Sequence, residues 1–227
     1  MKKIGILGGI SSASTAQYYT LLHDLFYQEH HHYYYPEIVI DSLNFQYFTD
    51  LENENKMDEY KAYILQSFKN LKAAGADFAI MAANSPHSVI ESIRHQVELP
   101  VLSIVDAVGQ RAQSLGYKKL LLTGIAYTMN RTFYQEGMAK YGIEVLIPTD
   151  EEKKIIDDII FSELCINVFT DASRKKFLDI AASYPVDAVI LGCTELPLLV
   201  SEKDTDIKLL NTLRIHCEET LRCACEE

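Results

Sequence analysis

The sequence predicts an α/β fold of two pseudo-symmetric, doubly wound parallel-sheet domains, with the functional site in the cleft between them. Short apolar runs typical of buried strands alternate with longer segments of helical spacing along the whole chain. A second observation is a repeat: residues 77–85 and residues 187–195 each read as Asp, an apolar run, small residues and a polar ending. A motif that recurs in the same order indicates two related halves, and ligands of such sheets bind beyond the carboxyl ends of the strands.

The elements follow in order from this pattern. In the first half we expect strands at 3–7, 37–43, 77–82 and 100–104, and helices at about 11–28, 58–74 and 87–96. In the second half we expect strands at 119–122, 145–147, 187–192 and 207–210, a helix from Thr128 or Asn130 to about 141, one or two helices within 150–183, and a last helix from about 212. The final helix is expected to return to the first half. The predicted domains are therefore 1–100 plus 212–227, and 101–211.

Composition limits the possible functions. The chain has 227 residues, 48% of them hydrophobic, and a net charge of −11, which argues against nucleic acid or an anionic membrane as a partner. The N-terminus lacks the pattern of a signal peptide, and no apolar run is long enough for a membrane span. Five cysteines without framework spacing indicate a reduced, cytoplasmic protein. The histidines at 30–32 lack the spacing of a known metal site, so no metal is expected.

Four strand-to-helix turns are candidates for the functional site. They are residues 8–12, 83–85, 123–128 and 193–195. Each is expected to offer free backbone N–H groups at a helix start, where a carboxylate or phosphate can bind without a lysine. The Gly8-Gly9 turn has neither the GxGxxG spacing nor a P-loop lysine, so a dinucleotide or ATP has weak support.

Cys193 is the residue most suited to chemistry. A thiol at a helix N-terminus is expected to have a pKa lowered from about 8.5 towards neutrality, so that the thiolate acts as a base or nucleophile. The alternative is a buried, inert cysteine that packs the end of a strand. The matching position of the first repeat is Ala83, which has no group able to transfer a proton.

Five segments together resemble the cofactor-independent aspartate/glutamate racemase family over essentially the whole chain. They are residues 8–15 (GGISSAST), 83–87 (ANSPH), 127–129 (YTM), 161–165 (FSELC) and 191–195 (LGCTE). The resemblance implies two pseudo-symmetric α/β domains, no cofactor, a homodimer, and two cysteines that take and return the α-proton of an amino acid. It also implies that the substrate carboxylate is held by Asn84, Ser85 and Thr194.

The same resemblance assigns further substrate-binding residues, which are Ser11, Tyr127, Thr128, Glu163 and Glu195. The sequence departs from the family pattern at three places. Ala83 replaces the first catalytic cysteine, residues 43–46 (LNFQ) lack a substrate-binding arginine, and Cys165 stands where the family has a lysine. Glu163 and Glu195, if ionised, favour a substrate ammonium group.

These observations predict a PLP-independent racemase of aspartate or glutamate with Cys193 as acid/base. Ala83 implies impaired or one-sided activity, unless it is an engineered substitution. Two alternatives stay open. One is a single-cysteine decarboxylase of a malonate-type acid, in which the thiol only supplies a proton. The other is a binding protein for an amino acid or dicarboxylate that has lost turnover.

Overall fold

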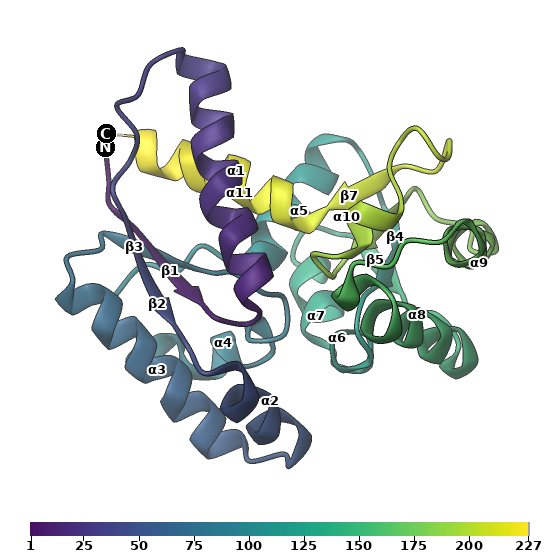
Figure 1. The fold of residues 1–227 in the computed structure, drawn as a ribbon, viewed down its shortest axis with the longest axis horizontal. Helices are drawn as coiled ribbons and strands as arrows, with labels where there is room; N and C mark the ends of the chain where they lie inside the picture. The colour runs from purple at the N-terminus through teal and green to yellow at the C-terminus, as the bar shows by residue number, and fades with distance from the viewer. Residues whose placement is uncertain (227) are drawn as a thin grey trace. The chain divides into compact units, whose positions relative to one another are not determined.

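The computed structural model describes residues 1–226, which form two compact units (Figure 1). The first consists of Met1–Ile104 together with the described residues from His216 onward, and the second of Val105–Ile215. Each unit has its own parallel sheet with helices around it, so the predicted α/β class is confirmed. No helix in the described part of the chain is long and apolar enough to cross a membrane.

The first unit has the strand order β2-β1-β3. The strands are β1 (Ile4–Gly8), β2 (Ile38–Ser42) and β3 (Phe78–Met81). The helices are α1 (Ser12–His30), α2 (Phe45–Asn53), α3 (Met57–Ala73), α4 (His87–Ile93), a 3₁₀ turn at Arg94–Gln96, and the part of α11 (Thr212–Cys225) that begins at His216. Ile4 is in register with both Ile38 and Phe78.

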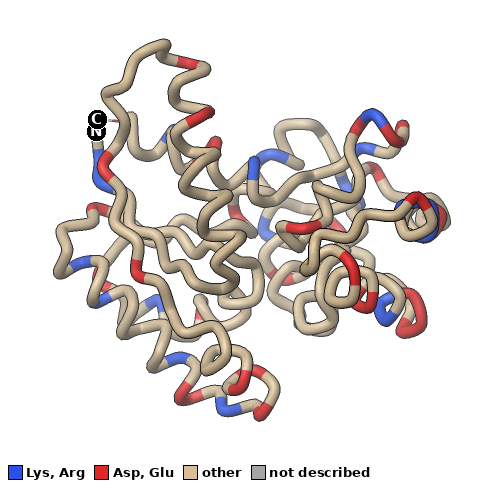
Figure 2. Tube along the Cα trace, viewed as in Figure 1, with Lys and Arg blue, Asp and Glu red and all other residues tan. Residues whose placement is uncertain are grey.

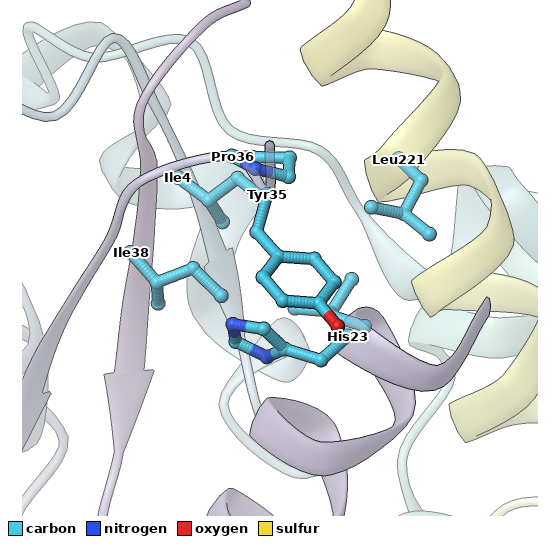
Figure 3. Close-up of a pocket in the computed structure, with 7 residues that line it drawn as sticks. Ile4, His23, Tyr35, Pro36, Ile38 and Leu221 are labelled. Atoms are coloured by element: carbon cyan, nitrogen blue, oxygen red, sulfur yellow. The ribbon is translucent and has the colours of Figure 1, made fainter. Parts of the chain in front are cut away.

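Helices cover both faces of this sheet, which explains why its strands read as apolar runs rather than as alternating patterns. Leu7 packs with residues of α3, and a Cβ at Gly5 would touch Leu71 of α3, so these two positions face that helix. Ile4 points to the opposite face, where it lies with Leu22 of α1 and Leu221 of α11 (Figure 3). In Figure 1, α1 and α3 lie on opposite sides of the sheet.

The histidine-rich segment after α1 is an aromatic cluster. The crevice in Figure 3, beside His23 and Tyr35, has no room for a water molecule. The rings of His23 and Tyr35 meet edge to face at 4.6 Å, and His30 and His32 both lie against Phe26. These contacts give the segment a packing role in covering the edge of the core.

The second unit has the strand order β5-β4-β6-β7. The strands are β4 (Lys119–Thr123), β5 (Glu144–Leu146), β6 (Ala188–Leu191) and β7 (Leu209–Asn211). The helices are α5 (Ile104–Ser114), α6 (Ala126–Asn130), α7 (Phe133–Ala139), α8 (Asp150–Ser162), a 3₁₀ turn η2 (Leu164–Ile166), α9 (Asp171–Ala182) and α10 (Leu196–Leu199). Leu121 and Val189 pack on one face against Ile160 of α8 and Phe177 of α9.

The repeat has a structural cause that is the same in both units. The Asp77 carboxylate accepts the backbone N–H of Lys3 at 2.6 Å, and the Asp187 carboxylate accepts that of Lys119 at 2.9 Å. Asp77, which precedes β3, therefore fixes the start of the neighbouring strand β1, and Asp187, which precedes β6, fixes the start of β4. At the other end, Ala82 N–H donates to Leu7 O and Gly192 N–H donates to Thr123 O. The two turns that carry positions 83 and 193 thus leave their sheets at equivalent places.

Three expectations about the elements were wrong. Residues 100–104 form no strand: Val101 makes a single bridge to Ala79, and α5 begins at Ile104. The helix expected from Thr128 or Asn130 to 141 is two helices, because the chain is extended at Arg131 between them. Between β2 and α3, where no helix was expected, the chain forms α2, and the side chain of its N-cap Asn44 accepts the N–H of Tyr47.

Candidate functional site

Position 83 lies on the turn that follows β3 in the first unit. Ala83 is half-buried, and its carbonyl oxygen accepts a hydrogen bond from Nδ1 of His87 at 3.0 Å. The hydroxyl of Ser14 donates to the carbonyl oxygen of Ala82 at 2.6 Å, which holds the start of α1 beside the same turn. The backbone of the turn is therefore fixed, but the side chain at position 83 is a methyl group without acid or base function.

His87 supports this turn as a neutral ring. Its Nε2 accepts the backbone N–H of Ile104 at 3.1 Å, so both ring nitrogens are bound to the backbone and Nδ1 carries the proton. Burial and, to a smaller extent, the neighbouring His216 together lower the pKa of His87 to about 3. Burial likewise lowers the pKa of His216 to about 4; this ring bonds to Tyr18 and to the carbonyl of Leu102. His87 has no nitrogen left for a substrate.

The other predicted residues of this unit surround the turn. Ser11 caps α1, where its hydroxyl accepts the N–H of Ser14 at 3.3 Å. One of the amides expected to be free is therefore occupied. Asn84 and Ser85 are buried, and their carbonyls accept the N–H groups of His87 and Ser88 in the first turn of α4.

Cys193 follows β6 in the second unit and is bound to a carboxylate. Its thiol donates to Oε2 of Glu195 at 2.9 Å, and the Thr194 hydroxyl donates to the same oxygen at 2.8 Å. Cys193 and Glu195 are half-buried, and Thr194 is buried. The thiol proton thus has a defined acceptor two residues along the chain.

The prediction of a lowered thiol pKa was wrong. Burial, together with the negative charge of Glu195, raises the pKa of Cys193 well above its usual value. The helix that follows, α10, has only four residues, and its N-cap is Glu195 itself. A carboxylate therefore occupies the position from which a helix dipole was expected to favour the thiolate. The resting form of Cys193 is the protonated thiol.

The turn after β4 is fixed by α8. The amide of Ala126 donates to Oδ1 of Asp157 at 2.6 Å, and Lys153 donates to Oδ1 of Asn130 at 2.9 Å. The Ala126 amide, expected to be free for an anion, is therefore occupied. Thr128 between these anchors is fully buried, and its hydroxyl has no hydrogen-bond partner among the described residues. Tyr127 is half-buried, and the guanidinium of Arg131 lies 4.9 Å from its ring centre.

Glu163 and Cys165 lie around η2. The Glu163 carboxylate accepts the hydroxyl of Ser173 at 2.7 Å, which ties it to the start of α9. Cys165 is exposed, and its pKa is raised by partial burial and by the charges of Glu195 and Asp157. Cys165 and Cys193 also act on each other electrostatically. Cys165 lies on η2, which packs against α10, the short helix that follows Glu195, whereas Glu163 is engaged with α9.

Each unit therefore assembles its own group of predicted residues at the carboxyl edge of its sheet. Asp157 is a participant that sequence reasoning missed. It lies 31 positions from the amide that it accepts, on a helix with several other acidic residues, so no local pattern distinguishes it.

Two α/β units with equivalent turns after β3 and β6, the second of which carries the half-buried thiol of Cys193, are the arrangement expected above for an amino-acid racemase. Residues 7–220 match the Asp/Glu/Hydantoin racemase family. The chain belongs to this family.

Solved structures share the fold over the full chain. A candidate Asp/Glu racemase from Yersinia pestis is 29% identical with a TM-score of 0.93, and an aspartate racemase homologue from Pyrococcus horikoshii OT3 is 35% identical with a TM-score of 0.88; both comparisons cover 100% of each chain. A glutamate racemase from Hydrogenobaculum sp. is 28% identical over 155 residues, which are 64% of this chain and 55% of that protein. The chain thus spans about half the length of the curated relatives it matches.

Proposed function

We propose that the protein is a cofactor-independent amino-acid racemase, an isomerase that moves the α-proton of its substrate with Cys193 as acid/base. The observation that carries the proposal is the 2.9 Å hydrogen bond from the Cys193 thiol to Glu195, at the end of a central strand in a chain of the racemase family. Aspartate and glutamate are the first substrates to test, because they are named for its relatives.

Glu195 gives the thiol a route for its proton. To remove an α-proton, the thiol first passes its own proton to Oε2 of Glu195, and the resulting thiolate then takes the proton from the α-carbon. In the reverse direction the thiol donates its proton to the α-carbanion, and Glu195 reprotonates the sulfur. The negative charge of Glu195 also favours a substrate ammonium group nearby.

The substrate contacts are proposed unit by unit. In the first unit they are Ser11, Asn84 and Ser85, with the last two directed to the α-carboxylate. In the second unit they are Tyr127, Thr128, Glu163, Thr194 and Glu195. Thr128 supports this assignment best, because it is a fully buried hydroxyl without a partner among the described residues.

Ala83 makes the proposed reaction asymmetric. A racemase needs one group to take the proton and a second to return it from the opposite side, and alanine can do neither. We therefore propose that Cys193 exchanges the α-proton of one enantiomer with solvent faster than it inverts the centre, with a water or serine as a poor second acid.

The family resemblance further supports a homodimer located in the cytoplasm.

The test is proton NMR in D₂O with the L- and D-forms of aspartate and glutamate, followed by chiral chromatography. Loss of the α-proton signal with slow inversion is the expected result. Cys193→Ala should abolish the exchange, and Cys223→Ala, a half-buried thiol on α11, should leave it intact. Absence of exchange with every amino acid tested, or exchange that survives Cys193→Ala, would overturn the proposal.

A further inference from the structure

We propose that Asp157 is a positioning residue: it holds the α6 turn in place so that the hydroxyl of Thr128 binds a substrate carboxylate oxygen, with Lys153 as a second anchor. This inference rests on the racemase function proposed above and deepens it, because it names side chains of α8 that act on the substrate through another residue. All the residues concerned belong to the second unit.

α6 is too short to hold its own conformation. It has five residues, whereas an isolated helix in water needs about 12–15 residues to be even marginally stable. Its N-cap is Ile125, whose side chain makes no capping hydrogen bond. The chain is extended again at Arg131, so α6 does not continue into α7. The position of α6 therefore depends on its contacts with other elements.

α8 contacts α6 and binds it at both ends (Figure 1). The Asp157 carboxylate accepts the N–H of Ala126, the first residue of α6, at 2.6 Å. Lys153 donates to Oδ1 of Asn130, the last residue of α6, at 2.9 Å. The two anchors on α8 are one helical turn apart, about 6 Å along the axis, and so are the two groups that they bind. Asp157 thus supplies the cap that Ile125 lacks.

α8 is itself fixed to the sheet of the second unit. It begins with a capping box, in which the side chains of Thr149 and Glu152 each accept a backbone N–H of the other residue. Ile156 and Ile160 of the same helix lie in one apolar core with Leu121 of β4. Through α8, the anchors of α6 are therefore tied to the strand that leads into it.

The two anchors are set apart from the other charged residues of α8. Figure 2 shows acidic and basic residues following one another along this helix. Lys153 is buried, whereas Lys154 beside it is exposed. Asp157 is half-buried, whereas Asp158 beside it is exposed. The lysine and the aspartate that bind α6 are the ones that face the body of the unit, and their neighbours serve as matched controls.

The α6 turn starts beside the turn that carries Cys193. Thr123, the last residue of β4, is in register with Leu191, the last residue of β6. The carbonyl of Thr123 also accepts the N–H of Gly192 at 2.8 Å. Met129 of α6 lies in the apolar core against which Cys193 packs. A shift of α6 would therefore change the surroundings of the thiol.

Thr128 is the residue of α6 whose polar group is unused. Its side chain is fully buried, and its hydroxyl has no partner among the described residues. Threonine hydroxyls within helices often bond to a carbonyl three or four residues earlier, and a buried polar group left unpaired is costly. Tyr127 beside it is half-buried, so the turn reaches the surface of the unit. A substrate carboxylate oxygen at this turn gives the hydroxyl a partner while Asp157 keeps α6 in place.

The experiment measures α-proton exchange in D₂O against the concentration of L- and D-aspartate and glutamate, and ligand-observed NMR gives Kd in the same samples. Asp157→Ala should raise KM about tenfold with kcat within about twofold, because the lost contact serves the ground state and the transition state alike. Asp157→Asn keeps an acceptor for the Ala126 N–H and should bring KM to within about twofold of the wild type. Asp158→Ala should leave KM unchanged.

A double-mutant cycle identifies the residue through which Asp157 acts. Thr128→Val removes the hydroxyl, keeps the shape of the side chain and should raise KM about tenfold by itself. In that background Asp157→Ala should add less than about twofold, since both changes remove the same contact, whereas independent roles would multiply to about a hundredfold. Lys153→Met should raise KM about threefold, and Lys154→Met should not change it.

Ala126→Pro breaks the same hydrogen bond from its other end. Proline has no N–H, and it suits the first position of a helix after a residue with ψ of 156°, as Ile125 has. This variant should reproduce the rise in KM, and it decides the question if Asp157→Ala does not fold, which thermal unfolding shows.

The outcomes separate the two proposals. An unchanged KM in Asp157→Ala or Ala126→Pro, no restoration by Asp157→Asn, or multiplied effects in the cycle would overturn the positioning role while the racemase function stands. An unchanged KM in Lys153→Met would remove the second anchor. If amino acids bind without exchange, the racemase function fails, and the Kd values of the same variants decide the positioning role by the same criteria. If none of the four binds to the wild-type protein, both proposals fail.

Discussion

The Glu195→Gln substitution should make Cys193 more reactive towards alkylation. The change removes a negative charge 2.9 Å from the sulfur and keeps the size of the side chain. At this distance the repulsion between thiolate and carboxylate is about 6 kcal/mol with an effective dielectric constant near 20. Because both side chains are half-buried, solvent screens part of it, and about 2 kcal/mol remains. The thiolate population at a given pH then rises about 30-fold.

The rate rises less than the population, because a less basic thiolate is a weaker nucleophile. With a Brønsted coefficient of about 0.4–0.5, the expected gain in the alkylation rate is about fivefold. The assay is iodoacetamide labelling at pH 8, followed by mass spectrometry of the peptide that contains Cys193. Glu163→Gln removes the same charge from a carboxylate bound to Ser173 and should leave the rate unchanged. An unchanged or slower rate in Glu195→Gln, or an equal gain in Glu163→Gln, would refute the electrostatic account of this thiol.

Three further predictions concern activity and stability. Ala83→Cys supplies a second thiol after β3 and should raise the inversion rate about 10²-fold or more, measured by chiral chromatography; no gain would remove position 83 from the mechanism. Since burial holds the pKa values of His87 and His216 at about 3 and about 4, below the ordinary 6.5, the unfolded chain binds more protons below pH 6.5. Stability should therefore fall as the pH drops from 6.5 towards 4, by about 1.4 kcal/mol per histidine at pH 5.5, and urea titrations at pH 7.5 and 5.5 check this; equal midpoints would contradict it. Gly192→Ala would place a Cβ 2.5 Å from the carbonyl oxygen of Thr123, so the midpoint of thermal unfolding should fall by about 5 °C; an unchanged midpoint would show that the strand ends can separate.

The architecture could be predicted from the sequence because the repeat marks the same structural element in both halves, a strand preceded by an aspartate. Asp77 and Asp187 each end a helix-to-strand connection and bind the backbone at the start of the neighbouring strand. A buried parallel sheet also needs apolar residues on both faces, which produces strand patterns that stand out from the helices around them. The apolar runs and the recurring aspartate are visible in the sequence alone, whereas the hydrogen bonds that explain the aspartate span 74 and 68 positions and needed the structure.

Residues 100–104 show where local reasoning fails. The run Pro100–Ile104 has strand composition, but Val101 alone makes a bridge, and the backbone N–H of Ile104 is bound by His87. A buried ring from 17 positions away thus takes a donor that a continuing strand would have used. The competing partner is tertiary, and no pattern within the segment reveals it.

The protonation state of Cys193 was unpredictable for a related reason. Glu195 is only two residues away, but its effect depends on which way its side chain turns, and the expected helix dipole depends on a helix longer than the four residues of α10. The sequence identified the chemically important pair. The direction of its pKa shift required the geometry.

A protonated Cys193 changes what the alanine at position 83 implies. Had the thiol pKa been near neutrality, the thiolate could remove an α-proton directly, and the missing group would only be the one that returns it. With the pKa raised by burial and by Glu195, the sulfur holds its proton at rest and is poised to donate. Removal of a proton then requires Glu195 to accept first, so the carboxylate is as necessary to the forward step as the thiol. Exchange should accordingly speed up as the pH rises towards the thiol pKa, and a substrate ammonium beside Glu195, by offsetting its charge, should make that ionisation easier in the complex than in the free protein.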